Sequence, residues 1–511
     1  MLANLQKTPS VLKLDPSDNV GVATRAIGRG TVVGVGVTAL ADIATGHKLA
    51  LAAIALGAPV RKYGQVIGFA SRPITAGEHV HTHNCEMGAL ALDFTRTEES
   101  GKAGSVQPPA PAYFQGIVRP NGRVATRNYL AVLTSVNCSA AVATGIVERF
   151  RTRGLSDFPN VDGVMATVHG QGCGMAGSGE GYELLQRTLA GFARHPNFTG
   201  ALIAGLGCEV NQPKDLCEHQ GLIAGDLLQT LSIQDAGGTL KAIERGVQLI
   251  EKMLPVANQT RRESVSASHL MLALQCGGSD GYSGITANPA LGRAVDLLVA
   301  QGGTAILSET PEIYGAEHLL IRRAVTSKVA EKLMARLAWW ESYTKKHGAE
   351  MNNNPSPGNK AGGLTTILEK SLGAVAKCGT SPLVDVYEYA EPITQKGFVF
   401  MDSPGYDPCS ATGQVASGAN ILCFTTGRGS VFGCKPTPSI KLATSTGLFE
   451  RMREDMDVNC GDIIDGGATI ASKGQEIFEL ILRVASGEKS KSELLGIGDQ
   501  EFVPWQIGAV M

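Results

Sequence analysis

The sequence is poor in aromatic residues and carries almost no net charge. Phe, Trp and Tyr make up 5% of the 511 residues, which leaves little material for the aromatic platforms that stack on nucleic acid bases. The 45 Lys and Arg residues face 47 Asp and Glu residues, so the formal net charge is −2 and no global field attracts nucleic acid or an anionic membrane. We expect neither as a partner. Any anionic ligand must be held by local positive groups.

Long apolar runs and a secretory leader are also missing. No stretch reaches the roughly 18 apolar residues that a membrane-spanning helix needs. Residues 1–10 lack the basic start and apolar core of a secretory signal. The eleven cysteines, an odd number scattered along a large chain, are typical of reduced thiols. These features predict a cytoplasmic protein.

Two glycine motifs of nucleotide-binding proteins are absent. Residues 354–363, NPSPGNKAGG, resemble an anion-cradling loop in composition but lack the GxxxxGK[ST] spacing. No GxGxxG motif convincingly follows a predicted strand, so nicotinamide chemistry is not supported. Glycine itself is abundant, with 63 of 511 residues, or about 12% against roughly 7% in ordinary proteins. We expect many tight turns and close backbone approaches.

The composition predicts a globular chain of several domains, because 43% of residues are hydrophobic and 18% are charged. Short alternating segments at 31–40, 47–54, 58–70 and 74–84 predict a small, mostly β domain. Further along, strands alternate with helical patterns, among them a long helix near 240–254, and this alternation is typical of α/β folds with largely parallel sheets. The predicted division is a β domain at 1–94, a linker at 95–112, an α/β domain at 113–262 and a C-terminal α/β domain at 263–511.

The motif HVHTHN places three of the ten histidines within five residues. In a strand, His79, His81 and His83 would share one face, because side chains alternate with a period of two. Three imidazoles on one face can bind a metal or act as acid and base. The alternative is a solvated edge strand without a catalytic role.

Four cysteines each follow an apolar strand at a predicted turn: Cys138, Cys173, Cys208 and Cys276. In open α/β sheets ligands bind outside the carboxyl ends of the strands, so the four side chains are expected to converge. Thiolates are soft ligands that suit iron, zinc or an iron–sulfur cluster. Each cysteine alone is as well explained as a small buried apolar residue. The CxxC spacing of a zinc ribbon is absent.

Several cations are candidates for binding a carboxylate. Arg119, Arg123 and Arg127 precede a predicted strand, and we expect one of them to grip a carboxylate in the bidentate geometry of guanidinium while the others face solvent. The predicted substrate-binding residues are Arg127, Asn128, Lys360 and Arg428.

The chain resembles the altronate and galactarate dehydratase family of sugar-acid hydro-lyases. The motifs that carry the resemblance span nearly the whole chain: HVHTHN, NGRVATRNYL, GLGCEVNQ, LQCGGSDGYSGITANPALG, NPSPGNKAGGL, KSLGAVAKCG, FTTGRGS and DMDVNCGDIIDG. The resemblance implies that the first domain is of the SAF type and closes over the α/β body, bringing its histidines to the cysteine-lined turns. HVHTHN is more similar to the altronate branch than to the galactarate branch.

The resemblance also implies a reaction and a cofactor. A sugar acid such as D-altronate or galactarate would lose water to give a 2-keto-3-deoxy or 5-keto-4-deoxy acid, with Fe(II) or Mn(II) as the metal. The predicted catalytic residues are His81, His83 and His169, and the predicted metal ligands are His81, His83 and the four cysteines. A mononuclear ion is favoured over an iron–sulfur cluster, because no CxxC signature is present.

Two other functions remain open at this point. The family also resembles sulfolactate sulfo-lyases, which eliminate sulfite instead of water. A noncatalytic sugar-acid binding protein would need Arg and Asn but has no use for clustered His and Cys. We further expect a homo-oligomer, in the form of a dimer.

Overall fold

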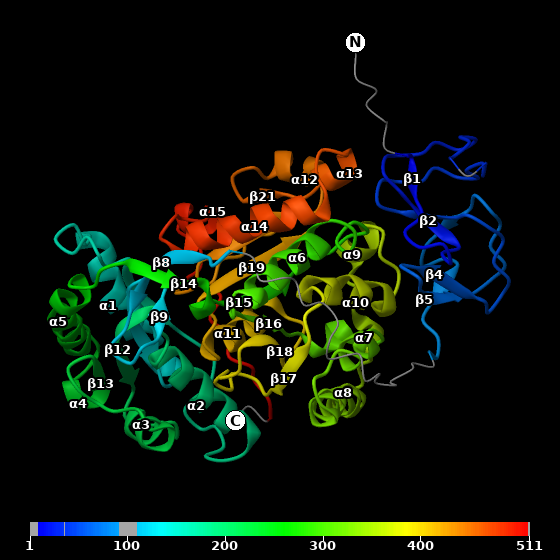
Figure 1. Cartoon of the computed structure of the whole chain (residues 1–511). Helices are drawn as coiled ribbons and strands as arrows, with labels where there is room; N and C mark the ends of the chain where they lie inside the picture. Colours follow the sequence, from blue (N-terminus) through cyan, green and yellow to red (C-terminus); the bar gives the residue numbers. More distant parts are fainter. Residues whose placement is uncertain (1–8, 35, 91–109, 509–511) are drawn as a thin grey trace, which may run out of the picture.

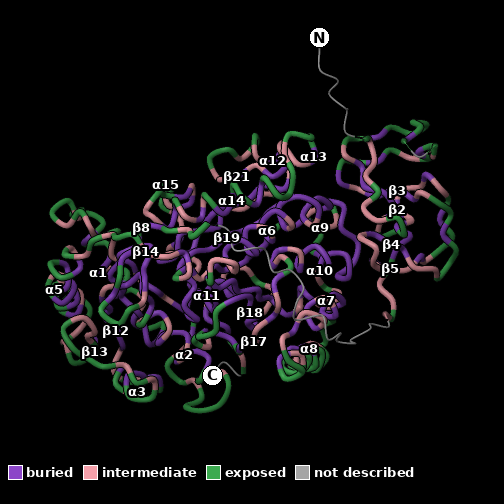
Figure 2. Tube along the Cα trace, viewed as in Figure 1, coloured by how far each residue is buried: buried purple, intermediate pink, exposed green. Residues whose placement is uncertain are grey.

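The computed structural model describes residues 9–34, 36–90 and 110–508, and in this part of the chain the strands form five sheets (Figure 1). The predicted linker at 95–112 lies outside the described residues except for its last three positions. Figure 2 shows buried residues concentrated along the strands in the interior, with exposed residues on the outer helices and turns. None of the described helices is both long and apolar enough to cross a membrane.

Residues 9–90, here called the N-terminal domain, form two small antiparallel sheets, β1-β2-β3-β6 and β4-β5-β7. The strands are β1 (Val11–Leu12), β2 (Val20–Ala23), β3 (Lys48–Ala50), β4 (Pro59–Lys62), β5 (Gln65–Ala70), β6 (His79–Val80) and β7 (Cys85–Glu86). The strand expected at 31–40 is wrong, since only an isolated bridge joins Val32 to Thr38. Gly36 adopts a φ of 76°, a left-handed conformation that turns the chain there.

The second domain is built on a four-stranded parallel sheet in the order β11-β10-β12-β13. The chain moves from β10 outward to β11 and then crosses to β12, so its direction reverses between β10 and β12. The strands are β10 (Tyr129–Thr134), β11 (Gly163–Thr167), β12 (Phe198–Gly205) and β13 (Leu228–Ser232). The helices are α1 (Ala140–Arg153), α2 (Glu180–Ala193), α3 (Pro213–Gln220), α4 (Ile233–Ala236) and α5 (Thr239–Asn258), the last of which confirms the predicted long helix.

A three-stranded sheet joins the two α/β parts. β8 (Tyr113–Val118) pairs antiparallel with β9 (Val124–Ala125) on one side and with β14 (Glu263–Ser266) on the other. The two parts are therefore linked by hydrogen bonds across the predicted boundary at residue 262.

The C-terminal domain contains a seven-stranded parallel sheet in the order β17-β18-β16-β15-β19-β20-β21. β16, β17 and β18 lie on one side of β15, with β17 at the edge and β18 inserted between β16 and β17, and β19, β20 and β21 follow in order on the other side, so the reversal lies between β15 and β19. The strands are β15 (Met271–Cys276), β16 (Thr304–Leu307), β17 (Leu383–Tyr387), β18 (Gly397–Met401), β19 (Ile421–Thr426), β20 (Ser439–Ala443) and β21 (Val458–Asn459). The helices are α6 (Ala287–Ala300), α7 (Glu317–Ile321), α8 (Ser327–Lys346), α9 (Pro357–Ala361), α10 (Ile367–Val375), α11 (Asp407–Ala416), α12 (Thr446–Arg451), α13 (Asp462–Asp465), α14 (Ile470–Ala485) and α15 (Lys491–Leu494).

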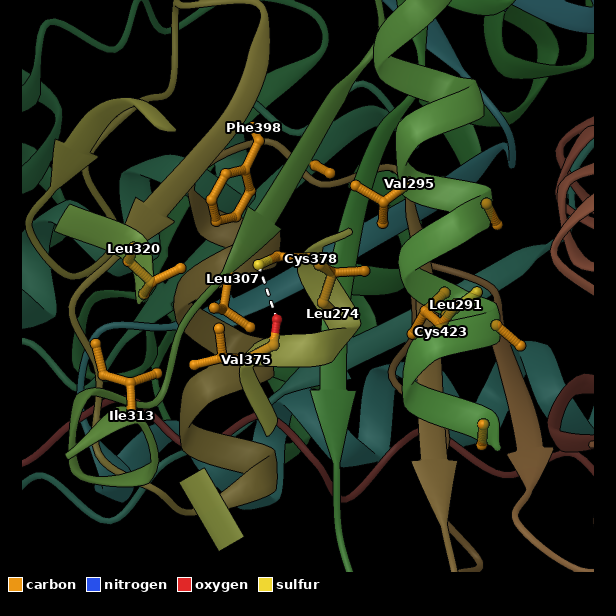
Figure 3. Packing of buried hydrophobic residues seen from close by; sticks show 14 of the residues in the cluster. Leu274, Leu291, Val295, Leu307, Ile313, Leu320, Val375, Cys378, Phe398 and Cys423 are labelled. Carbon is orange, nitrogen blue, oxygen red and sulfur yellow. Dashed lines mark hydrogen bonds between the residues drawn. The ribbon is translucent and has the colours of Figure 1, made fainter. Parts of the chain in front are cut away.

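Alternation along β15 sorts the core into two layers. Leu272 and Leu274 belong to the cluster that contains Leu291 of α6, whereas Ala273 belongs to the cluster that contains Val415 of α11. Figure 3 shows the first layer, with α6 lying beside the apolar side chains of the strands. Both faces of the sheet are covered, which is typical of parallel sheets.

The N-terminal domain contacts the C-terminal domain through a buried ion triad. Lys48 Nζ and Lys62 Nζ lie 2.8 and 3.0 Å from the two carboxylate oxygens of Glu369 on α10, and all three side chains are buried. Burial alone would raise the pKa of Glu369, but the two ammonium groups outweigh it and lower this pKa to about 2. The contact places the histidine-bearing domain beside α9 and α10 (Figure 1).

Candidate active site between the N-terminal and C-terminal domains

The reversal point of the seven-stranded sheet is formed by two glycine-containing turns. β15 ends at Cys276 and is followed by residues 277–280, while β19 is followed by Gly427, Arg428 and a further glycine. Backbone N–H groups of Gly427 and Arg428 donate to the carbonyl oxygen of Gly278 at 3.1 and 2.8 Å. Ligands of open α/β sheets bind outside the carboxyl ends of the strands at such a point.

A cavity of 550 Å³ lies at this reversal point and is lined by both domains. His47 comes from the N-terminal domain, while Asp280, Arg428 and Arg451 come from the C-terminal domain. Burial raises the pKa of Asp280, which accepts a hydrogen bond from Thr444 Oγ1. The cavity therefore offers guanidinium groups for a carboxylate beside a half-buried acid, which is a combination suited to a small hydroxy acid.

Gly427 is required for this geometry, because a Cβ atom at that position would overlap the carboxylate of Asp280. Arg428, predicted to bind substrate, is exposed and lines the cavity.

Four histidines of the N-terminal domain gather together, and one of them, His47, lines this cavity. The ring of His47 lies 5.2 Å from that of His79 and 5.3 Å from that of His81, and the ring of His83 lies 5.5 Å from that of His79. The strand expected through all three histidines of HVHTHN is wrong beyond its first two residues, because β6 covers only His79–Val80 and the chain then turns. The turn, rather than strand alternation, brings the rings together.

Hydrogen bonds hold the histidine cluster against the C-terminal end of α9. His47 Nε2 lies 3.2 Å from the carbonyl oxygen of Ala361, and His81 Nε2 lies 2.8 Å from that of Lys360. His47 Nδ1 lies 3.1 Å from His79 Nε2. Carbonyl oxygens only accept, so both Nε2 atoms carry the proton in these bonds.

Three histidines of this cluster, His47, His79 and His81, are held in the neutral form. Burial lowers the pKa of His47 and of His81, and burial together with the neighbouring imidazoles lowers the pKa of His79 to about 3. Among the described residues, His83 is exposed and has only its ring contact with His79. A neutral imidazole is the form that binds a metal or accepts a proton, but in the described part of the chain no three histidines of this cluster have donor atoms with the spacing of ligands to one metal ion.

A buried polar network lies directly behind the turn at residues 277–280, and the sequence analysis missed it. Lys377 Nζ lies 2.8 Å from Cys276 Sγ and 3.4 Å from Glu309 Oε2, and Lys370 Nζ lies 2.6 Å from Glu312 Oε1. These residues are spread over 102 positions of the chain from Cys276 to Lys377, so no local motif could have revealed them.

The same network contains a set of atoms with metal-site spacing. One ligand atom from each of Cys276, Glu309 and Glu312 lies within 4.8 Å of the others, and the Oε1 atom of Glu309 is buried without a hydrogen bond. Such donors suit a divalent metal, although Lys370 and Lys377 already supply positive charge there. Burial raises the pKa of Cys276 to about 12, so its thiol keeps its proton at neutral pH unless a metal displaces it.

The other three predicted cysteine ligands lie elsewhere. Cys138, Cys173 and Cys208 are exposed and follow strands of the second domain, whereas Cys276 is buried in the C-terminal domain. In the described part of the chain, none of the three belongs to a group of three donors with the spacing of a single metal ion. The expected convergence of all four thiols with the histidines is therefore not found.

Arg127 is fully engaged within the protein, contrary to the expected role in carboxylate binding. Its Nε and Nη2 atoms donate to the two carboxylate oxygens of Glu493 at 2.6 and 2.8 Å. The remaining N–H groups donate to the backbone oxygens of Thr126, Val484 and Glu488. No donor is left for a substrate, so this geometry favours a structural role.

Asn128 and His169 are likewise surrounded by protein partners. Asn128 Nδ2 donates to the carbonyl oxygens of Asn160 and Ala257, and Arg119 Nη2 donates to its Oδ1. His169 Nε2 lies 3.0 Å from the carbonyl oxygen of Thr134, and its Nδ1 accepts from a backbone N–H, which leaves no ring nitrogen for catalysis. Lys360 is half-buried, and its carbonyl oxygen rather than its ammonium group is the atom that contacts the histidine cluster.

Three protein-family models match the chain in succession. They are described as the altronate/galactarate dehydratase SAF domain at residues 9–88, the second domain of D-galactarate dehydratase/altronate hydrolase at 116–258, and the C-terminal region of D-galactarate/altronate dehydratase at 267–510.

Full-length relatives agree with these matches. Altronate dehydratase of Bacillus subtilis (strain 168) is 36% identical over 489 residues, covering 94% of this chain and 95% of the relative. Galactarate dehydratase (L-threo-forming) of Escherichia coli (strain K12) is 37% identical over 507 residues, covering 97% of each. A (2R)-sulfolactate sulfo-lyase subunit beta of Chromohalobacter salexigens is 32% identical over 394 residues, which cover 76% of this chain and 96% of the relative.

Proposed function

The chain belongs to the altronate and galactarate dehydratase family, and from this premise we propose that it removes water from a sugar acid in the cavity between its N-terminal and C-terminal domains. One observation supports this location above all: the neutral imidazole of His47 and the exposed guanidinium groups of Arg428 and Arg451 line one cavity at the reversal point of the seven-stranded sheet. The reaction class is that of a hydro-lyase, a carbon–oxygen lyase.

Different residues at the cavity carry out different parts of the elimination reaction. Arg428 binds the substrate carboxylate, because its guanidinium group lines the cavity and presents a planar fork of donors. A neutral imidazole of the cluster takes the weakly acidic proton beside that carboxylate, and the hydroxyl group on the next carbon leaves as water. The enol formed then rearranges to the keto acid without a further cofactor.

We assign the metal to the histidine cluster, with His81 and His83 as ligands and His47 and His79 beside them. His81 would bind through Nδ1, which lies 3.1 Å from Thr82 Oγ1 and would have to give up that contact. When bound there, Fe(II) or Mn(II) would act as a Lewis acid toward the substrate oxygens, an effect worth several kcal/mol in metalloenzymes. The low pKa values of His47, His79 and His81 support this assignment, because ligand nitrogens need not lose a proton first. An iron–sulfur cluster is the alternative form of iron.

The choice between altronate and galactarate is a finer proposal. HVHTHN favours altronate, whereas the identities of 36% and 37% to the two kinds of relative do not separate them. The sulfo-lyase alternative is less favoured, because that relative matches only 76% of the chain and at lower identity. We also propose that the protein works in the cytoplasm as a homodimer, with the eleven free thiols in support of a reducing compartment.

Substitution of single histidines tests the proposed site. We expect His81→Ala and His83→Ala each to lower kcat by at least about a hundredfold, because each removes a ligand or a base, with little effect on thermal unfolding. The matched control is His269→Ala, which removes an exposed histidine outside the cluster and should leave kcat unchanged. Near wild-type kcat in both cluster variants would remove the histidines from the mechanism.

A substrate screen tests the reaction itself. Altronate, galactarate and 2-sulfolactate are each supplied with Fe(II), with Mn(II) and without metal under reducing conditions. Formation of a keto acid from a sugar acid supports the proposal, whereas sulfite release from sulfolactate alone would show a sulfo-lyase. Binding of a sugar acid without any product under all conditions would indicate a noncatalytic binding protein.

A further inference from the structure

The exposed thiols of the chain are confined to one place. All eleven cysteines lie within the described residues and are unpaired; eight are buried, and only Cys138, Cys173 and Cys208 are exposed. Free cysteine is among the residue types most often buried. Three exposed thiols that share one edge of one sheet therefore require an explanation beyond packing.

The three cysteines follow three neighbouring strands of the second domain. Their strands, β10, β11 and β12, lie side by side in the order β11-β10-β12, and all run parallel. Parallel strands place their carboxyl ends at the same edge, and the chain reverses between β10 and β12 at that edge. The three thiols thus stand at the second reversal point of the molecule.

Hydrogen bonds tie the three cysteine-bearing loops to one another. Asn137, next to Cys138, donates its backbone N–H to the carbonyl oxygen of Gln171 at 2.9 Å. Val210 donates its backbone N–H to the carbonyl oxygen of Cys173 itself at 3.0 Å, which joins the loops after β11 and β12.

A third hydrogen bond links the remaining pair of loops: Ser135 Oγ donates to Glu209 Oε1 at 2.7 Å and so joins the loops after β10 and β12. The three loops are therefore held close together as one rim.

We propose that Cys138, Cys173 and Cys208 hold an iron–sulfur cluster that has one iron without a protein ligand. A single metal ion needs donors that meet at one point, and in the described chain these three thiols belong to no such group. A cluster instead spreads its thiolates over different irons, so the ligands stand farther apart. His169 on the same loop is occupied by two backbone partners and does not complete a closed zinc site.

The surroundings suit this cofactor. Residues 170–181 contain six glycines, whose backbone can approach the cluster closely and donate N–H groups to its sulfurs. Because the three cysteines are exposed, an iron without a protein ligand would be open to solvent there and would take a small anionic oxygen ligand such as a hydroxy acid. In Figure 1 this rim belongs to the second domain at the left, while the histidine-bearing domain lies at the right, so the site is separate from the cavity described above. It does not rest on the proposed function.

Cofactor content tests the proposal without any assay of turnover. The full chain is purified without oxygen and reconstituted with Fe(II) and sulfide under a thiol reductant, and iron, acid-labile sulfide, visible absorbance and the electron paramagnetic resonance spectrum after reduction are measured. We expect about four irons and four sulfides per chain, as a four-iron cluster requires. Cys138→Ser, Cys173→Ser and Cys208→Ser should each lose most of the iron, the sulfide and the visible absorbance.

Cys217→Ala is the matched control, because it removes a buried thiol of α3 in the same domain and should keep the full cluster content. Circular dichroism establishes that each variant is folded. A wild-type protein that binds no sulfide, or that binds one zinc ion in place of iron, would overturn the proposal, as would serine variants that keep the absorbance. A His81→Ala variant that loses turnover but keeps the cluster spectrum bears on the proposed function alone.

Discussion

At the scale of single residues, Arg127 shows how a side chain suited to substrate binding can be used for structure. We expect Arg127→Lys to lower the free energy of unfolding by about 2 kcal/mol or more, because a lysine cannot donate to both oxygens of Glu493 and to three backbone oxygens at once. The KM of the folded variant should be unchanged. Urea unfolding and steady-state kinetics at saturating metal measure the two quantities.

Arg151→Lys is the control for this prediction. Arg151 pairs with Glu148 on the surface, and both side chains are more than half exposed, so the same change should cost at most about 0.5 kcal/mol. A raised KM in Arg127→Lys with unaltered stability would restore Arg127 to the substrate site.

Residue types could be predicted from the sequence better than residue partners. The run of histidines at 79–83 is visible because its members are close in sequence. His47 completes the cluster but lies 32 positions earlier, and only the pairing of Leu49 with His79 across β3 and β6 brings it there. Arg127 had the right chemistry for a carboxylate, but the choice between a ligand and Glu493 depends on a contact 366 positions away.

At the scale of elements, the close contact between the N-terminal and C-terminal domains depends on a glycine, Gly281, in a turn that packs against Gly46. A Cβ atom at Gly281 would overlap the carbonyl oxygen of Gly46 in the N-terminal domain. We expect Gly281→Ala to push that turn outward, to move His47 away from the C-terminal end of α9 and to lower kcat/KM by about tenfold or more. Kinetics together with limited proteolysis at the domain contact measure both effects.

Gly225→Ala provides the comparison, since a Cβ atom at Gly225 would meet no other atom within 4 Å. It should behave as wild type. Unaltered kinetics in Gly281→Ala would mean that the two domains need not meet closely for catalysis.

Whether a segment forms a helix or a strand could be predicted from its hydrophobic periodicity only where the periodic segment is long. The helix expected near 240–254 and the parallel sheets with strands of five or more residues were predictable, because period and length agree. Residues 31–40 and 81–84 were expected to be extended, but the described residues of 31–40 form only an isolated bridge within irregular backbone, and 81–84 form a turn. Their alternation spans few residues, and glycine at 36 and the hydrogen bonds of Asn84 with His81 override it.

At the scale of the whole molecule, the ion triad of Lys48, Lys62 and Glu369 makes the domain contact sensitive to acid. The pKa of Glu369 in the fold is about 2, below its ordinary value of 4.5, so the carboxylate stabilises fully above about pH 4.5 and loses this contribution as the pH falls toward 2. We expect Glu369→Gln to lower the free energy of unfolding by about 3 to 5 kcal/mol at pH 7 and by less at pH 3.5.

Urea unfolding of wild type and variant between pH 7 and pH 3.5 measures how the difference in their free energies of unfolding becomes smaller on acidification. Glu148→Gln, which removes an exposed partner of Arg151, should show almost no such difference at any pH. If the difference in free energy of unfolding between wild type and Glu369→Gln stays constant on acidification, the ionised carboxylate of Glu369 is not what stabilises the fold.

The order of domains along the chain could be proposed from composition, but not how they meet. Lys48, Lys62 and Glu369 are ordinary charged residues in the sequence, separated by more than 300 positions from one end of the triad to the other. Their burial arises only when two surfaces come together. No pattern within either domain encodes it.

The buried ion triad implies that the N-terminal domain and the rest of the protein could be encoded as two separate polypeptides. Because the N-terminal domain is held by ion pairs and hydrogen bonds to α10 and its preceding loop, the peptide connection between residues 90 and 110 need not be what keeps the parts together. Two polypeptides, 1–90 and 110–511, produced in the same cell should assemble and copurify, with Glu369→Gln as the variant that separates them. A relative named as a beta subunit, which aligns with three quarters of this chain, shows that this family tree contains proteins made in more than one piece. One continuous polypeptide and two separate polypeptides would then form the same assembled structure.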